Sequence, residues 1–251
     1  MSLRETWDLH AENWIRWART PGHDSYWRFH RRAFLDLVPD PGRLTLDVGG
    51  GEGRVARDLQ RLGHRVVEFD GSPTLARAAA THDESVPVAV ADAARLPAAD
   101  DVADLVVAFM SLQDIDDLDG AFGEAARVLV PGGRLCAAIV HPINSAGSFE
   151  GDRDDAARPF VMRDSYFEER IYTEVMERDG LAMTFVSRHR SLADFVRPLE
   201  DHGFLIEGVR EVPGGDRDPA WKREPMFLHL RAVKPSGRSA PSRSARRGRT
   251  R

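Results

Sequence analysis

Three carboxylates stand at equivalent places in the chain, each at or just after the end of a short apolar run. Asp47 closes the run at residues 43–48, Asp70 follows residues 65–69, and Asp92 follows residues 86–91. If the runs are neighbouring parallel strands, their carboxyl ends meet at one edge of a sheet. A ligand along that edge would meet the acids in turn. Carboxylates accept hydrogen bonds from ammonium groups, ribose diols and amino groups, so the pattern indicates a nucleotide-like ligand.

A glycine loop follows Asp47 directly, with Gly49, Gly51 and Gly53 in alternate positions. Glycines there let the main chain turn tightly and approach a ligand. The dinucleotide fingerprint would need a further glycine at position 54, where Arg54 stands. An NAD-type oxidoreductase is therefore the weaker alternative, and it also leaves Asp92 without a role.

The elements around these residues alternate between strands and helices. We expect strands at 43–48, 65–69, 86–91, 104–110 and 133–140, with helices at 53–62, 73–81 and 118–129. Such alternation predicts an α/β fold with a Rossmann-like, doubly wound parallel sheet. A helix at 191–202 and strands at 204–212 and 227–233 complete a sheet of seven strands.

Residues 44–142 resemble the methyltransferase type 11 group of the class I S-adenosylmethionine (SAM) methyltransferases. Besides the glycine loop, the resemblance rests on three stretches in the same order. They are Phe69-Asp70-Gly71-Ser72-Pro73, the run from Ala91 to Pro97, and the helix, turn and strand from Ala126 to Leu135. The resemblance implies SAM as cofactor, S-adenosyl-L-homocysteine as product, and a sheet with six parallel strands and an antiparallel last strand.

The resemblance also implies a role for each acid. Asp47 would reach the methionine ammonium group, Asp70 would bind both ribose hydroxyls, and Asp92 would take the adenine amino group while the Ala93 amide faces the ring. The expected cofactor-binding residues are Asp47, Gly49, Gly51, Gly53, Asp70, Gly71, Ser72, Asp92, Ala93 and Met110.

Two residues are candidates for a catalytic base, His141 at the end of the strand at 133–140 and His189 in the segment after it. The alternative for His141 is that it only shapes the turn before Pro142. The resemblance is incomplete nearby, since no histidine pair follows Met110 and Ser111. The acidic run at 114–119 is expected to cap and solvate a helix.

Bulk properties exclude several functions. The net charge is -5, but residues 235–251 contain six arginines and no acid, so the body carries about -11. An acidic body argues against a nucleic-acid substrate and favours a small-molecule acceptor. No apolar run reaches the roughly 20 residues that cross a bilayer, and the single Cys136 suits a reducing compartment, so we expect a cytoplasmic protein. No His and Cys spacing indicates a metal site. The oligomeric state stays open.

The chain divides into three parts on this interpretation. Residues 1–42 form an N-terminal helical cap, with helices at 3–19 and 24–38 and Asp24 as N-cap. Residues 43–234 form the SAM-binding domain, in which 141–190 is a lid insertion with a hairpin turn at Asp179 and Gly180. Residues 235–251 form a disordered tail. The tryptophans near the N-terminus either pack the core or line a pocket.

The predicted function is therefore a SAM-dependent methyltransferase that transfers a methyl group to O, N or C of a small molecule by in-line displacement. The alternative is a catalytically inactive protein of the same fold that binds the cofactor or a partner.

Overall fold

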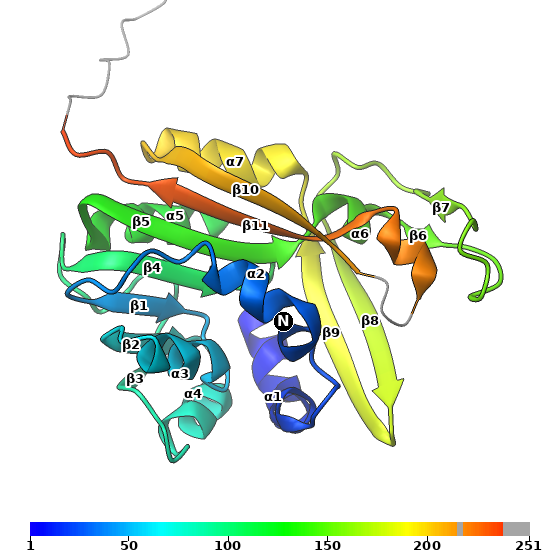
Figure 1. The fold of residues 1–251 in the computed structure, drawn as a ribbon, viewed down its shortest axis with the longest axis horizontal. Coiled ribbons are helices and arrows are strands. Elements are labelled where there is room, and N and C mark those ends of the chain that lie inside the picture. The colour runs from blue at the N-terminus through cyan, green and yellow to red at the C-terminus, as the bar shows by residue number, and fades with distance from the viewer. Residues whose placement is uncertain (215–217, 238–251) are drawn as a thin grey trace, which may run out of the picture.

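The computed structural model describes residues 1–214 and 218–237, which contain a seven-stranded sheet (Figure 1). Its order is β10-β11-β5-β4-β1-β2-β3. β11 runs antiparallel to both of its neighbours, β5 and β10, and the other six strands are parallel, as predicted. The strands are β1 (Thr45–Val48), β2 (Val66–Asp70), β3 (Val88–Val90), β4 (Ala103–Phe109), β5 (Leu129–Val140), β10 (Leu205–Pro213) and β11 (Pro225–Val233).

Helices cover both faces of the sheet, which makes it doubly wound. On one face, α5 (Leu118–Val128) and α7 (Leu192–Asp201) pack on the sheet through Phe122 and Phe195. On the other, α3 (Arg54–Arg61) and the segment before β1 pack through Leu59 and Phe34. Because both faces are covered, every residue of β1 is buried and the strand lacks an alternating pattern.

The N-terminal part differs from the prediction in its second half. α1 (Leu3–Arg19) forms as predicted, with a capping box between Ser2 and Glu5. The helix expected at 24–38 is present from 25 to 35, but its first part is a π-helix, η1 (Tyr26–His30), which continues directly into the short α2 (Arg31–Leu35). Asp24 is not its N-cap: it is buried and ion-paired with Arg54, because a carboxylate taken out of water needs an opposite charge.

The segment between β5 and α7 carries a long hairpin, β8 (Arg170–Arg178) and β9 (Leu181–His189), which forms its own two-stranded sheet. Asp179 and Gly180 both have positive φ, 50° and 76°, which is typical of the tight turn predicted there. Figure 1 shows the hairpin reaching past the strand ends alongside α1. Buried Met183 packs there with Trp14 and Trp17.

The remaining elements are short. They are α4 (Pro73–Ala80), η2 (Leu112–Asp114), α6 (Pro142–Ala146), β6 (Ser148–Phe149), β7 (Phe160–Val161) and η3 (Pro219–Lys222). The largest differences from the predicted strand bounds are in β3, which is shorter, and in β5, which begins at Leu129; the other strands of the main sheet are shifted by one or two residues at an end. The predicted disorder of the tail concerns mostly residues 238–251, which lie outside the described residues. No helix in the described ranges has both the length and the apolarity needed to span a bilayer.

Candidate functional site

A cavity of about 930 Å³ lies at the carboxyl ends of β1 to β4, beneath α1, η1 and the β8–β9 hairpin. Its size falls within the roughly 300–1,000 Å³ of small-molecule sites. Nine of the ten residues expected to bind the cofactor line it: Asp47, Gly49, Gly51, Asp70, Gly71, Ser72, Asp92, Ala93 and Met110. Gly53, His141 and His189 are not among its lining residues.

The backbone conformation of the loop requires glycine at positions 49 and 51. Gly49 has a φ of +71°, and a Cβ there would lie 2.4 Å from the Cβ of Ser111. The Ser111 hydroxyl in turn donates to the Val48 carbonyl at 2.8 Å, which ties the ends of β1 and β4 together. Gly51 has a φ of +68°, a conformation that side chains disfavour. The loop can therefore present its backbone to the cavity.

Gly53 lies beneath the loop and is tightly packed. It precedes the first residue of α3 with a φ of +89°, and a Cβ there would meet Arg57 Nη1 at 2.8 Å and Glu68 Oε2 at 3.2 Å. It thus permits the turn into α3 and close packing beneath the loop.

Asp70 holds the loop in place from the end of β2. Its Oδ2 accepts from the Gly51 amide and its Oδ1 from the Ser72 amide, both at 2.8 Å. Burial raises the pKa of Asp70 to about 6, although both amides favour the charged form. Each carboxylate oxygen keeps further acceptor capacity, so Asp70 can also bind ligand hydroxyls.

Two other acids, Asp47 and Glu68, face each other on paired strands without such partners. All four of their carboxyl oxygens are buried with no hydrogen-bond partner among the described residues. Burial, reinforced by the neighbouring Asp70 carboxyl, raises the pKa of Asp47 to about 7, while burial and Asp47 raise that of Glu68 to about 9. Unpaired buried acids are costly, so this corner of the cavity favours a cation.

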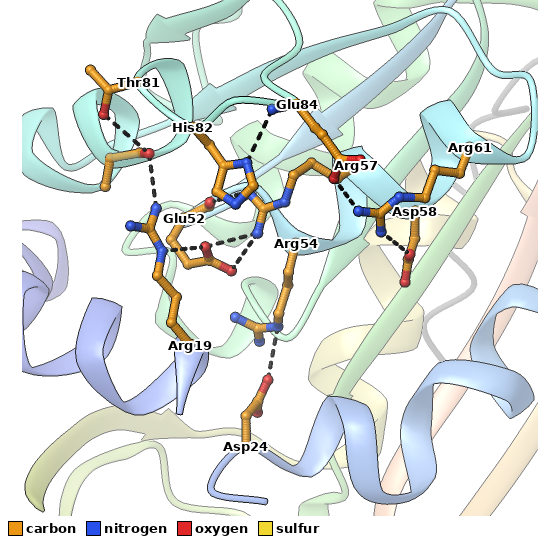
Figure 2. A network of polar contacts seen from close by, with 11 residues as sticks. Arg19, Asp24, Glu52, Arg54, Arg57, Asp58, Arg61, Thr81, His82 and Glu84 are labelled. Carbon is orange, nitrogen blue, oxygen red and sulfur yellow. Dashed lines mark hydrogen bonds and ion pairs between the residues drawn. The ribbon is translucent and has the colours of Figure 1, made fainter. Parts of the chain in front are cut away.

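Arg54 is the protein's own cation at this corner (Figure 2). Its Nε lies 2.9 Å from Oδ2 of Asp24, and its guanidinium carbon lies 4.7 Å from the centre of the Trp14 ring. The charge of Arg54 lowers the pKa of Asp47, against the larger effect of burial. In the sequence, Arg54 stood out only because it interrupts a glycine pattern, and nothing there indicated that it faces the cavity.

Asp92 and Met110 lie just after the carboxyl ends of β3 and β4. Asp92 is exposed, and its Oδ1 accepts from the Ala94 amide at 3.0 Å. Met110 has a φ of 55°, which is uncommon for a residue with a side chain, and its amide donates to the Ala138 carbonyl at 2.7 Å. Strained backbone of this kind is concentrated at ligand sites.

The two histidines proposed as bases are engaged elsewhere. His141 Nδ1 accepts from the Ile143 amide at 3.1 Å as the N-cap of α6, and its Nε2 lies 3.2 Å from Glu211 Oε1. His189 uses both ring nitrogens, at 2.7 Å from Ser145 Oγ and 2.9 Å from the Tyr166 carbonyl. The structure therefore supports the turn-shaping alternative for His141.

Aromatic side chains form the wall that faces the glycine loop. Trp7 and Trp14 of α1 and Phe185 of β9 make edge contacts with centroid distances of 5.8 to 6.4 Å. All three line the cavity, so these tryptophans both pack and line it. Asp114 and Tyr172 also line it, and the sequence indicated neither of them. Asp114 was predicted to be a solvated residue of an acidic run, and only Asp117 of that run caps α5.

Metal ligands do not gather in the part of the chain that the structure describes, where no three His, Cys, Asp or Glu side chains are grouped to hold an ion.

Comparison with known proteins agrees with this geometry. Residues 46–137 match the family model described as a methyltransferase domain. The chain is 39% identical over 114 residues to a demethylmenaquinone methyltransferase from Mycolicibacterium paratuberculosis, a match that covers 45% of this chain and 48% of that protein. The chain thus aligns with about half the length of this curated relative.

Among solved structures, an S-adenosylmethionine-dependent methyltransferase from Mesorhizobium loti superposes with a TM-score of 0.66 and 26% identity, over 84% of this chain and 98% of that one. The [4+2]-cyclase SpnF shares the fold, with a TM-score of 0.63 and 21% identity over 94% and 98% of the two chains. Residues 46–137 thus match a methyltransferase domain, and the seven-stranded sheet has the fold of the S-adenosylmethionine-dependent methyltransferase from Mesorhizobium loti.

Proposed function

We propose that this protein transfers a methyl group from SAM to a small-molecule acceptor bound in the same cavity. The observation that carries the proposal is the pair of unpartnered, buried oxygens of Asp47 at the end of β1. A carboxylate in that state favours a bound cation, and the methionine end of SAM supplies an ammonium group.

The other lining residues suit the rest of the donor. Asp70 can accept from the ribose hydroxyls while it holds Gly51, and Asp92 with the Ala93 backbone lies at the neighbouring strand end, where the adenine would rest. Gly71 is covered by α1, since a Cβ there would lie 3.0 Å from Arg4 Cγ. The donor supplies an electrophilic methyl group on a positively charged sulfur, so the protein mainly has to orient the acceptor and exclude water.

The acceptor would lie between the glycine loop and the aromatic wall of Trp7, Trp14 and Phe185. Aromatic walls favour a flat, largely apolar acceptor. The curated relative acts on demethylmenaquinone according to its name, which supports a ring-bearing small molecule here as well. Residues 141–190, which we expect to form a lid, contribute Phe185 to this wall, and α1 contributes Trp7 and Trp14. Together they would cover the bound acceptor.

The first test is binding of the donor to the full chain. We expect calorimetry to show binding of SAM and S-adenosylhomocysteine and no binding of NADH, which would exclude the oxidoreductase alternative. A screen with labelled SAM against phenols, amines and carboxylic acids then measures methyl transfer. Donor binding without transfer to any class would favour a non-catalytic protein or an activity such as that of the cyclase, which has the same fold. Absence of donor binding would contradict the proposal.

The pH dependence of donor binding tests Asp47 itself. A cation binds the charged carboxylate, and the pKa of Asp47 is about 7 without ligand. Affinity for SAM should therefore rise with pH up to about 7 and then level off, with proton release at lower pH. Asp47→Asn should weaken binding at least about tenfold and flatten this profile, whereas Asp83→Asn, on an exposed turn, should change neither.

A further inference from the structure

The β8–β9 hairpin presents one polar face to the cavity. Side chains at cross-strand pairs point to the same side of a sheet, and Tyr172 pairs with Ser187 while Glu174 pairs with Phe185. All four line the cavity. Opposite this face lies Asp114, the last residue of η2, which follows β4 along the chain.

The backbone around Asp114 is firmly held. Its amide donates to the Ser111 carbonyl at 2.9 Å. The buried guanidinium of Arg190 donates to the carbonyls of Leu112 at 3.3 Å and Ile115 at 2.9 Å, on either side of Asp114. The carboxyl group is therefore positioned by rigid structure, as a group that reacts with a ligand must be.

The carboxyl of Asp114 has unused acceptor capacity. Oδ2 accepts from Gln113 Nε2 at 3.3 Å, while Oδ1 is buried with no hydrogen-bond partner among the described residues. The Trp7 indole nitrogen is likewise buried and unpartnered. Ser187 and Trp7 both lie beside the carboxyl and favour its charged form, as does Arg190. An unsatisfied acceptor in a ligand cavity indicates a missing donor on the ligand.

We propose that Asp114 is the base that takes the hydroxyl proton of a phenol or quinol acceptor, with Tyr172 and Ser187 orienting that hydroxyl. The inference rests on the proposed function. The proton passes from the acceptor oxygen to Oδ1 of Asp114. The oxygen, or the ring carbon beside it, then forms a bond to the methyl carbon as the carbon–sulfur bond breaks with its electron pair on sulfur. Attack by carbon is followed by loss of the ring proton and return of a proton to oxygen.

The protonation of Asp114 suits this role. Burial raises its pKa to about 7, so it ionises near neutral pH and can both take and release a proton there. Burial and the nearby Asp114 also raise the pKa of Tyr172, which stays a neutral hydroxyl able to donate and accept. Of the charged groups around this carboxyl, Arg190 favours its charged form. Arg170 and Glu174 of β8 border the same cavity beside Tyr172, and Asp116 is paired with Arg188.

Binding of 1-naphthol to the full chain saturated with S-adenosylhomocysteine tests the inference without turnover. We expect the wild-type complex to bind it, more tightly above the pKa of Asp114 than below. Asp114→Asn should weaken binding at least about tenfold above that pH, while its affinity for S-adenosylhomocysteine stays unchanged. The matched control is Asp119→Asn, an exposed residue of the same acidic run outside the cavity, which should behave like wild type.

Turnover supplies the second readout. With 1-naphthol and saturating SAM, kcat/KM should rise with pH through about 7 in the wild type and lose that rise in Asp114→Asn, with a fall of about 10²- to 10⁴-fold. Because SAM is saturating, the ionisation of Asp47 does not contribute to this pH profile of kcat/KM. Unchanged turnover in Asp114→Asn, failure of the wild-type complex to bind 1-naphthol, or transfer to amines alone would overturn the inference. Each result is separate from failure of the proposed function, which would appear as loss of donor binding.

Discussion

Three neighbouring acids at the strand ends have similar burial but different surroundings. Asp70 accepts two backbone amides, whereas Asp47 and Glu68 have no hydrogen-bond partner among the described residues. Asp70 therefore shapes the loop even without ligand, and Asp47 keeps both carboxyl oxygens without a hydrogen-bond partner in the part of the chain that the structure describes. Glu68 lies beneath Gly50, where a Cβ would come within 2.5 Å of its Cγ. Side-chain type alone does not distinguish these states.

Substitution of Asp70 tests the donor site at this scale. Asp70→Ala removes the ribose acceptor and both amide contacts, and hydrogen bonds to charged groups contribute about 1.5–3 kcal/mol each. We expect SAM affinity by calorimetry to fall at least about tenfold. Asp101→Ala, far from the cavity on an exposed turn, serves as control. Unchanged affinity in Asp70→Ala would refute the ribose assignment.

The sequence predicted which residues lie at the strand ends but not which side chains meet across the cavity. Asp47, Asp70 and Asp92 were placed by strand parallelism, which depends only on local pattern. Asp114, Tyr172 and Arg54 are brought there by tertiary contacts, through Arg190 and the hairpin. The neighbouring residues in the sequence do not indicate that these three side chains come together at the cavity. His141 was proposed from its place at the end of a predicted strand and His189 from the resemblance of its segment to the family, but the contacts of their ring nitrogens depend on the fold and could not be known.

At the scale of elements, the hairpin and α1 form one wall because they pack on each other and only partly on the sheet. Met183 is fully buried between them, with Trp14, Trp17 and Leu75. α1 is also joined to the first turn of α4, since Asp8 Oδ1 accepts from the Thr74 amide at 3.2 Å. The aromatic wall thus depends on a small satellite core.

Truncation of Met183 tests this dependence. Removing a buried Met side chain costs about 2–5 kcal/mol when the site cannot collapse. In Met183→Ala we expect amide hydrogen exchange in β8 and β9 to become at least about tenfold faster, with β1 and β4 unchanged. Met162→Ala, whose side chain is 52% exposed, is the control. Equal protection of the hairpin in both variants would show that it is held independently of this core.

For the whole molecule, the buried acids make stability depend on pH. The pKa of Glu68 rises from an ordinary 4.5 to about 9 in the folded chain without ligand, so the folded state holds a proton that the unfolded state releases. The free energy of unfolding should then fall as pH rises from about 4.5 to about 9. The raised pKa of Asp47 also makes the free energy of unfolding fall, as pH rises to about 7.

Replacement of Glu68 tests this trend. Glu68→Gln removes the titrating group, so we expect urea denaturation at about pH 8 to show a gain of about 1 kcal/mol or more, and a smaller gain at about pH 5. Glu200→Gln, on the exposed side of α7, should leave the free energy of unfolding nearly unchanged at both pH values. A loss of stability in Glu68→Gln at the higher pH would contradict the pKa assignment.

The overall architecture could be predicted because alternating strands and helices along the chain indicate a parallel sheet. The antiparallel direction of the last strand followed from the family resemblance, and the tight turn of Asp179 and Gly180 followed from residue type. The π-helical form of η1 within the helix expected at 24–38 could not be predicted. The ion pair of Asp24 with Arg54 and the packing of Phe34 on the sheet, which fix this segment, are both long-range contacts.

The separate two-stranded sheet of the hairpin has one practical consequence. β8 makes its ladder bonds to β9 and none to the main sheet, and its side chains at 170, 172, 174 and 176 all border the cavity. A library randomised at Glu174 would therefore alter the lining of the cavity without disturbing the main sheet, whereas Met176 also packs on the satellite core. We expect such variants to change which acceptors the proposed methyltransferase takes.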